Sequence, residues 1–352
     1  MRVLVGLSGG IDSAVTALLL KKQGYDVVAA TMSTWREGNP LSGKLLKEAC
    51  FGPNEADDIA EAKRISSLLD IEYHVLDCAK EFERIVLEDF KNEYLAGRTP
   101  NPCVWCNAFI KFGALPQIAK EKGLVFDKFA TGHYANIVKV GDRWALKRGK
   151  DHTKDQTYFL YRLSQQQLSQ TLFPLGSYTK EEVKKIAYEN NLFTKEKKES
   201  QDFYGGAYND LLHVEPLQGK IVDTDGKVKG THQGYWNYTI GQRRGLGVSA
   251  EYPLYVIALD AEKNQVIVGY EDQTFQHTLK AREINWIVKP NGDKIELEAK
   301  IRSTSKAKKA LLIIESDQSV EIKFAERQKA ITPGQSIVFY KDDIVIGGAL
   351  ID

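Results

Sequence analysis

The stretch Gly6-Leu-Ser-Gly-Gly-Ile-Asp-Ser13 decides the fold of the first part of this 352-residue chain. It continues a β-branched apolar run at residues 2–7 and leads into helical apolar spacing over 13–23. Glycines permit a tight turn that brings backbone N–H groups against phosphate oxygens, and a helix N-terminus adds partial positive charge. The pattern predicts a phosphate-binding turn between a buried strand and a helix.

Several side chains of this loop suit a phosphorylated ligand. Ser8 and Ser13 carry hydroxyl donors, and Asp12 carries the carboxylate oxygens that a hard cation such as Mg²⁺ prefers. The chain contains no Gly-Lys-Ser or Gly-Lys-Thr, so the loop is not the kinase-type P-loop. We expect a nucleotide-binding loop in which Asp12 holds Mg²⁺; the alternative is a glycine-rich turn that binds nothing.

Strand and helix signals alternate over the first two hundred residues. Apolar runs predict further strands at 26–32, 71–76 and 126–131, and helical spacing predicts helices at 55–69, 82–94 and 108–122. Such alternation is typical of a doubly wound parallel sheet of Rossmann-like α/β type. Sheets of this kind bind ligands at the carboxyl ends of their strands, which is where the glycine loop lies.

After Tyr204 the pattern changes to β structure. Residues 219–226 resemble a hairpin, and short alternating runs recur from Leu254 to the end between turn signals. We expect a small β-rich central domain and a C-terminal β-barrel. The predicted domains are 1–204, 205–274 and 275–352.

Composition excludes several protein classes. Hydrophobic residues make up 43% and charged residues 27%, as in ordinary globular domains. No apolar run approaches the ~18–20 residues that span a bilayer. The valine-rich start runs into glycines and not into a small-residue cleavage site. We therefore expect a cytoplasmic protein with no membrane partner.

The overall charge and cysteine count say little about function, but one charged segment and one cysteine pair do. The formal net charge is +1, but residues 280–309 contain nine basic and four acidic residues, which suits either RNA phosphates or a solvated strand face. The four cysteines are Cys50, Cys78, Cys103 and Cys106. A Cys-x-x-Cys pair in a reducing compartment indicates metal or sulfur chemistry.

The loop at 6–13 resembles the PP-loop of the ATP pyrophosphatases, which have the HUP-type fold. Members of that superfamily cleave ATP between the α and β phosphates and adenylate an oxygen of their substrate. The resemblance implies ATP as the cofactor and assigns ATP contacts to the loop residues Gly6, Leu7, Ser8, Gly9, Gly10, Ile11, Asp12 and Ser13.

Further collinear motifs narrow the choice to one family. They are Gly97-Arg-Thr-Pro-Asn-Pro102 with Cys106-Asn107, then Ala130-Thr-Gly-His-Tyr134, Lys154-Asp-Gln-Thr-Tyr-Phe-Leu-Tyr161, Gly241-Gln-Arg-Arg-Gly-Leu-Gly247 and Thr332-Pro-Gly-Gln335. Together with the loop, they resemble the tRNA-specific 2-thiouridylases (MnmA/TrmU) over nearly the whole chain.

The resemblance implies an ATP-dependent tRNA-uridine 2-sulfurtransferase. Such an enzyme adenylates O2 of the wobble uridine in a tRNA anticodon stem-loop and replaces it by sulfur, releasing AMP and pyrophosphate. The partners implied are tRNA, no DNA, and a sulfur donor protein or free sulfide. Met32 and Gly132 are the additional ATP contacts. The residues implied in tRNA binding are Asn101, Pro102, Cys103, His133, Lys154, Asp155, Gln156, Arg302, Ser303 and Gln335.

The chain departs from the family at the cysteines. Common members use two, and Tyr204 stands where the persulfide-bearing one is expected, whereas Cys103 replaces an expected aspartate. A phenol cannot carry a persulfide. We expect Cys50, Cys103 and Cys106 to converge at one edge of the sheet, as catalytic residues and as ligands of three irons of a [4Fe–4S] cluster. This arrangement resembles that of the iron–sulfur tRNA thiolases.

Several alternatives stay open at this stage. Cys106 could relay a persulfide with Cys50 or Cys78 as partner, and zinc could bind the thiols if a fourth ligand were found. Cys78 closes a strand and is expected to be a buried small hydrophobe. The chain could instead be another PP-loop adenylating ligase, or an RNA-binding paralogue that has lost its chemistry.

Overall fold

The computed structural model describes residues 1–36, 49–193 and 202–352, and the chain divides into two compact units. Unit 1 comprises Met1–Val86, Pro102–Gly206 and Asp343–Ile346. Unit 2 comprises Leu87–Asn101, Ala207–Asp342 and Gly347–Asp352. Each unit therefore contains stretches that are far apart in the sequence.

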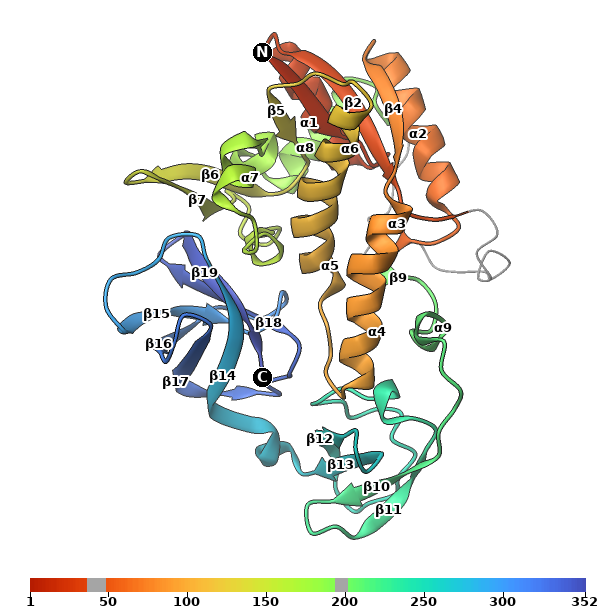
Figure 1. Ribbon diagram of the computed structural model, residues 1–352, viewed down its shortest axis with the longest axis vertical. Coiled ribbons are helices and arrows are strands. Elements are labelled where there is room, and N and C mark those ends of the chain that lie inside the picture. Colours follow the sequence, from red (N-terminus) through yellow and green to blue (C-terminus); the bar gives the residue numbers. More distant parts are fainter. Residues whose placement is uncertain (37–48, 194–201) are drawn as a thin grey trace. The chain divides into compact units, whose positions relative to one another are not determined.

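Unit 1 is built on a five-stranded parallel sheet (Figure 1). In spatial order its strands are β4 (Glu72–Asp77), β2 (Asp26–Ser33), β1 (Arg2–Gly6), β5 (Lys128–Ala130) and β8 (Thr171–Leu172). The side chains of Val3, Leu4 and Val5 in β1 are fully buried. The predicted doubly wound sheet is confirmed. Its strand order reverses direction between β1 and β5, the point at which such sheets bind ligands.

Helices and short strands complete unit 1. The main helices are α1 (Ile11–Lys22), α2 (Glu55–Leu68), α3 (Ala79–Phe82), α7 (Gln165–Gln170) and α8 (Lys180–Glu189), with 3-10 turns η3 (Thr157–Phe159) and η4 (Pro174–Ser177). A hairpin, β6 (Ala135–Val140) and β7 (Arg143–Arg148), follows β5. A separate two-stranded parallel sheet joins β3 (Ala49–Phe51) to β9 (Asp202–Tyr204).

Two helical runs include π-helical turns that the sequence pattern does not predict. One continuous run consists of α5 (Pro102–Trp105), η2 (Cys106–Ala114) and α6 (Leu115–Glu121), so this helix begins six residues before the predicted start at 108. The other π turn, η1 (Glu83–Leu87), lies between α3 and α4 (Glu88–Leu95). Because π turns often occur at functional sites, η2 marks the Cys-x-x-Cys segment for attention.

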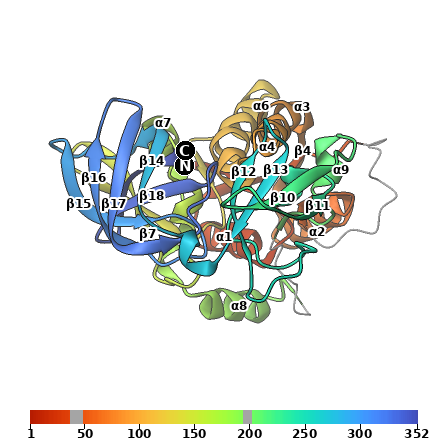
Figure 2. The same cartoon turned by 90° about the horizontal axis from the view of Figure 1, so that it is seen from below.

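Unit 2 is β-rich, as predicted. Its smaller sheet has the order β11 (Val228–His232), β10 (Gly219–Asp223), β13 (Gln265–Gly269) and β12 (Tyr255–Asp260), which lie side by side in Figure 2. The unit also contains α9 (Asn209–Leu212) and the 3-10 turns η5 (Tyr235–Asn237) and η6 (Glu271–Thr274). Pairing of β10 with β11 confirms the predicted hairpin.

The C-terminal strands close into a six-stranded β-barrel. In order they are β14 (Phe275–Trp286), β17 (Ser319–Lys329), β16 (Lys308–Ile314), β15 (Lys294–Lys300), β18 (Ser336–Lys341) and β19 (Ile344–Ile351). Antiparallel pairing of β14 with β19 closes the barrel and leaves no open edge between them. The predicted barrel is confirmed. Among the residues described, no helix is long and apolar enough to cross a membrane.

Candidate functional site

The glycine loop turns from β1 directly into α1. Gly10 is the N-cap of α1 and no side chain caps the helix there, so its first N–H groups have no side-chain acceptor in the cap position. Ser13 Oγ accepts a hydrogen bond from the Ser8 N–H at 3.1 Å and donates one to the Gly10 carbonyl oxygen at 3.0 Å. The loop is thus folded upon itself before any phosphate binds.

Two glycines of the site are required by close backbone approaches. Gly9 has φ +73°, and a Cβ there would lie 2.5 Å from the Asp58 carbonyl oxygen. A Cβ on Gly132 would lie 2.8 Å from the Asp12 carbonyl carbon and 2.9 Å from the Ser13 nitrogen. The residues that follow β1 and β5 therefore touch where the strand order of the sheet reverses. Gly132 packs against the loop itself; its contact with ATP stays a prediction.

Asp12 is held by two partners from distant parts of unit 1. Lys180 Nζ lies 2.7 Å from Asp12 Oδ1 and 2.9 Å from Oδ2, and the Tyr134 hydroxyl donates to Oδ1 at 2.9 Å. Lys180 is the first residue of α8 and is 7% exposed. Asp12 is therefore already neutralised by a buried ammonium, and a magnesium ion would have to share this carboxylate.

Cys103 and Cys106 lie on the helical run of α5 and η2. Cys106 is buried, and burial raises the pKa of its thiol to about 11; Lys111 acts to lower that pKa and Cys50 to raise it. Burial lowers the pKa of the Lys111 ammonium, but negative charge on Cys106, Cys50 and Cys103 outweighs burial, and its pKa is raised. One cation thus interacts with all three thiols that the sequence singled out.

Cys50 lies in β3, beside the residue that replaces the expected second cysteine. The parallel register pairs Phe51 with Tyr204, and the two ring centroids are 6.4 Å apart. Tyr204 is 2% exposed, whereas Cys50 is exposed. The preceding residues Glu199–Gln201 lie outside the described part of the chain. The fold therefore places Cys50 one residue from the strand partner of Tyr204, the position at which the family resemblance expects a second cysteine.

Cys78 behaves as predicted for a buried small residue. It is fully buried after β4, and burial, together with nearby acidic groups, raises the pKa of its thiol to about 12. Cys106 adds a smaller contribution in the same direction, which places Cys106 near the carboxyl end of β4. The convergence of Cys50, Cys103 and Cys106 at the ligand-binding edge of the sheet stays a prediction.

The three thiols do not form an assembled metal site. Within residues 1–36, 49–193 and 202–352, no group of three or more His, Cys, Asp or Glu side chains is placed to hold a metal ion. The thiols as arranged here do not fit the predicted cluster, which stays a prediction, and so does the role of Asp12 toward Mg²⁺.

The predicted tRNA contacts of unit 1 have partners within the protein. His133 is buried, and its Nδ1 lies 2.7 Å from Thr131 Oγ1; burial holds the pKa of the ring well below its usual value. Asp155 accepts a hydrogen bond from the Thr157 hydroxyl at 2.8 Å, and Gln156 Oε1 accepts one from the Tyr134 N–H at 2.9 Å. These contacts with tRNA stay predictions, as do those of Lys154 and Pro102.

In unit 2, the turn at 332–335 is hydrogen-bonded to the segment that precedes Asn101. Gln335 Nε2 donates to the carbonyl oxygens of Thr99 at 2.9 Å and Pro100 at 3.0 Å. The Thr99 N–H donates to the Pro333 carbonyl oxygen at 2.8 Å. Gln335 thus orders the approach to the segment expected to meet the target base.

Two further predicted tRNA contacts, Arg302 and Ser303, lie at the end of the barrel strand β15 and beyond. The Arg302 guanidinium donates to the Ala330 carbonyl oxygen and to Thr332 Oγ1. Ser303 is half-buried. These observations do not test whether Arg302 or Ser303 contacts RNA, so both contacts stay predictions.

The basic segment at 280–309 is less positive in the fold than in the sequence. Lys280 pairs with Glu315, Arg282 with Asp352, Lys289 with Asp317 and Lys308 with Glu326. All four acids lie outside the segment. Counting charge along a window overestimates the field of a sheet, because neighbouring strands supply counter-charges.

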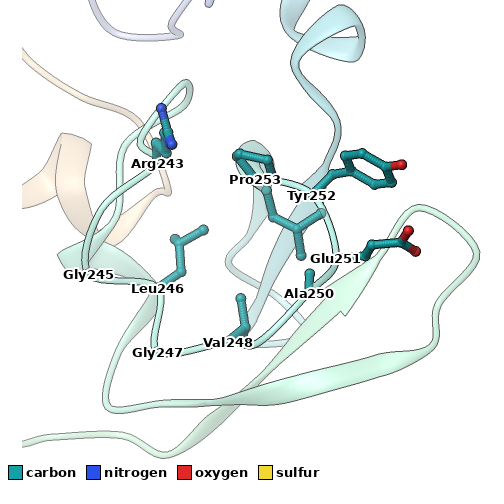
Figure 3. A pocket seen from close by; sticks show the side chains of 10 residues that line it. Arg243, Gly245, Leu246, Gly247, Val248, Ala250, Glu251, Tyr252 and Pro253 are labelled. Carbon is teal, nitrogen blue, oxygen red and sulfur yellow. The ribbon is translucent and has the colours of Figure 1, made fainter.

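A pocket of about 390 Å³ lies in unit 2, between residues 243 and 254. In Figure 3 Leu246 and Val248 point into the hollow, whereas Glu251 and Tyr252 point away from it. Arg243 at its rim is exposed. None of the residues that line this pocket belongs to the glycine loop or carries one of the candidate thiols.

Comparison with known proteins covers the whole chain. Family models match a tRNA methyl transferase HUP domain at residues 1–204, a tRNA methyl transferase PRC-barrel domain at 211–270 and an aminomethyltransferase β-barrel domain at 276–351. The tRNA-specific 2-thiouridylase MnmA of Endomicrobium trichonymphae is 50% identical, over 100% of this chain and 99% of its own. The chain belongs to the tRNA-specific 2-thiouridylase MnmA family.

Relatives from two other organisms in this family are similar over the same extent. The MnmA proteins of Clostridium kluyveri and Geotalea uraniireducens are 40% and 42% identical over 100% of this chain, and over 99% and 95% of their own lengths. The family that the motifs predicted is confirmed.

Three residues of this thiouridylase site were missed by sequence reasoning. Tyr134 and Lys180 hold Asp12, and Lys111 interacts with the thiols. Tyr134 stands within a motif already noted, and Lys111 lies in the helix predicted at 108–122. The only sequence signal near Lys180 is the capping pattern that starts α8 at Thr179. No local sequence pattern predicts that Lys180 pairs with Asp12.

Proposed function

We propose that this protein is an ATP-dependent tRNA 2-thiouridylase in which sulfur reaches the uridine through the thiols of Cys50, Cys103 and Cys106. Interaction of Lys111 with all three thiols is the observation that supports the proposal most. Membership of the MnmA family supports tRNA as the substrate.

The first step is activation of the uridine. The N-terminus of α1 and the loop before it bind ATP phosphates, with Ser8, Ser13 and the loop N–H groups as donors. O2 of the uridine attacks the α-phosphorus, and the bond from that phosphorus to the pyrophosphate oxygen breaks. Lys180 supplies positive charge at Asp12, where Mg²⁺ would also bind, and so stabilises the departing pyrophosphate.

The second step is exchange of oxygen for sulfur. A sulfur nucleophile forms a bond to C2, and the bond from C2 to the adenylated oxygen breaks, so that AMP leaves with that oxygen. Lys111 stabilises negative charge on the attacking sulfur, because its ammonium is electrostatically coupled to the three thiols. The sulfur itself comes from a donor protein or free sulfide.

The proposed reaction is tested with purified full-length protein, a tRNA transcript with uridine at the first anticodon position, Mg²⁺·ATP and sulfide under anaerobic conditions. We expect 2-thiouridine by nucleoside mass spectrometry, with one AMP and one pyrophosphate released per thiolated tRNA. Exchange of pyrophosphate into ATP that does not depend on RNA would instead favour a ligase acting on a small molecule.

The same preparation separates the two sulfur routes. If a [4Fe–4S] cluster is the cofactor, Cys50, Cys103 and Cys106 would hold it, and anaerobic protein would contain about four irons that are lost in Cys50→Ala, Cys103→Ala and Cys106→Ala. A persulfide relay needs a donor of sulfane sulfur in place of sulfide, because sulfide cannot form a persulfide on a thiol without an oxidant. If the relay operates, iron-free protein is active with that donor, and mass spectrometry finds one extra sulfur atom on Cys106 or Cys50. Cys78→Ala is the matched control in both cases.

A further inference from the structure

The helical turn that carries Cys106 also carries a pair of stacked aromatic rings. Trp105 and Phe109 have ring centroids 5.2 Å apart with an angle of 25° between the planes. Arg162 Cζ lies 4.7 Å from the Trp105 ring centroid, within the range of a cation–π contact. Nε of Arg162 also donates to the Tyr161 hydroxyl at 3.2 Å, which fixes the guanidinium.

The side chain of Phe109 is not part of the hydrophobic core. Its side chain is 39% exposed, and it is the only phenylalanine that is exposed among the residues the structure describes. The neighbouring Trp105 is half-buried, whereas Tyr161 beneath Arg162 is fully buried. The arrangement is a rigid stack whose outer member presents apolar ring surface to solvent.

We propose that Phe109, supported by Trp105 and Arg162, is a stacking platform for the base next to the target uridine in the anticodon loop. This inference rests on the proposed function. A uridine that is turned out of its stack leaves the neighbouring base without a partner on one side. Proteins that bind unpaired RNA stack such bases on aromatic rings or on arginine planes.

The position and the charge of the stack favour RNA as its occupant. Cys106 lies between Trp105 and Phe109 in the sequence, so a uridine brought to this thiol places an adjacent nucleotide at the same helical turn. Arg162 adds a positive charge that suits a nucleotide phosphate. A docking site for a sulfur donor protein is the competing occupant.

The test is a double-mutant cycle between protein and RNA. Full-length wild type and Phe109→Leu are titrated with a fluorescein-labelled anticodon stem-loop, either intact or abasic at the 5′ or the 3′ neighbour of the target uridine. Leucine keeps apolar bulk and removes the ring. Phe109→Tyr, which keeps the ring, is the matched control.

We expect Phe109→Leu to weaken binding of the intact stem-loop about ten-fold, the effect of losing one base–aromatic stack. For one of the two abasic stem-loops, the one that lacks the stacked base, Phe109→Leu should bind with the same affinity as wild type. Phe109→Tyr should bind the intact stem-loop within about two-fold of wild type. Equal weakening with the intact RNA and both abasic RNAs, or no weakening at all, overturns the proposal.

Two other outcomes are distinct. If Phe109→Leu binds RNA normally and uses sulfide normally but accepts less sulfur from a donor protein, the surface is a protein docking site and the proposal is wrong. If wild type does not bind the intact stem-loop, the proposed function itself fails.

Discussion

The ammonium of Lys180 lies within 2.9 Å of both carboxylate oxygens of Asp12, although the two residues are 168 positions apart in the sequence. The pair joins the N-terminus of α8 to the first turn of α1. It places a buried positive charge at the loop where phosphate is expected, so we infer that Lys180 acts on ATP as well as on the fold.

Replacing either partner is predicted to impair both stability and activation. Because Lys180 is nearly buried and Asp12 is about one-third exposed, Lys180→Met or Asp12→Asn lowers the free energy of unfolding by roughly 2–4 kcal/mol, less than the loss at a fully buried pair. The double variant loses less than the sum of the two. Urea unfolding measures this, and additive losses would show that the pair is not coupled.

The glycine loop provides a matched pair of substitutions. Gly9 and Gly24 both have positive φ, but a Cβ on Gly9 meets the Asp58 carbonyl oxygen at 2.5 Å whereas Gly24 has no atom within 4 Å. Gly24→Ala is expected to cost about 1 kcal/mol and to keep ATP binding. Gly9→Ala displaces the loop and weakens ATP binding at least ten-fold. Calorimetric titration with ATP measures both, and equal affinities would contradict the assigned role of the loop.

Tyr204 is predicted to serve packing and not sulfur transfer. Its ring lies among Phe51 and neighbouring aromatic side chains and is 2% exposed. Tyr204→Phe should retain thiolation within about two-fold, whereas Tyr204→Ala should lose roughly 3–5 kcal/mol of stability through the cavity it leaves. Nucleoside mass spectrometry and thermal unfolding separate the two effects. An inactive but stable Tyr204→Phe would assign chemistry to the phenol.

Stability is predicted to fall in mild acid because of His133. Burial holds the pKa of His133 well below its usual 6.5, so the unfolded chain binds the proton first as the pH falls. Stability is therefore fully present above about pH 6.5 and decreases below it, by at most about 1.4 kcal/mol per pH unit for one group. The pKa of His232 is also lowered by burial, and it contributes in the same direction.

His133→Asn is the variant that isolates this effect. Asparagine cannot titrate there, yet its amide can replace the ring nitrogen that lies 2.7 Å from Thr131 Oγ1. The slope of unfolding free energy against pH between about 5 and 6.5 should become smaller than in wild type. An unchanged slope would mean that His133 does not carry the acid sensitivity.

Sequence patterns predicted the parts of this fold that depend on local chemistry. The β-branched run before Gly6 is buried on both faces of a parallel sheet, and the glycine loop follows it because only small residues fit the approaches at Gly9 and Gly132. The closed barrel followed from alternating runs between turns. Family motifs located most of the remaining candidate residues.

What the sequence did not predict depends on contacts between distant segments. Pairing of Asp12 with Lys180, and of Phe51 with Tyr204, has no local signal, since two short strands or one buried lysine look ordinary in isolation. The π-helical turn from Cys106 to Ala114 is likewise invisible to a search for a 3.6-residue period. Charge at 280–309 was overestimated because its counter-charges lie on other strands.

The claim that three thiols deliver the sulfur is tested most directly by comparing Cys50→Ala with Cys78→Ala in the anaerobic thiolation of tRNA. Both residues are cysteines of unit 1, but only Cys50 is exposed and interacts with Lys111. We predict that Cys50→Ala still releases pyrophosphate from ATP in the presence of tRNA but forms no 2-thiouridine, while Cys78→Ala forms it at more than half the wild-type rate. Normal thiolation by Cys50→Ala would contradict the account.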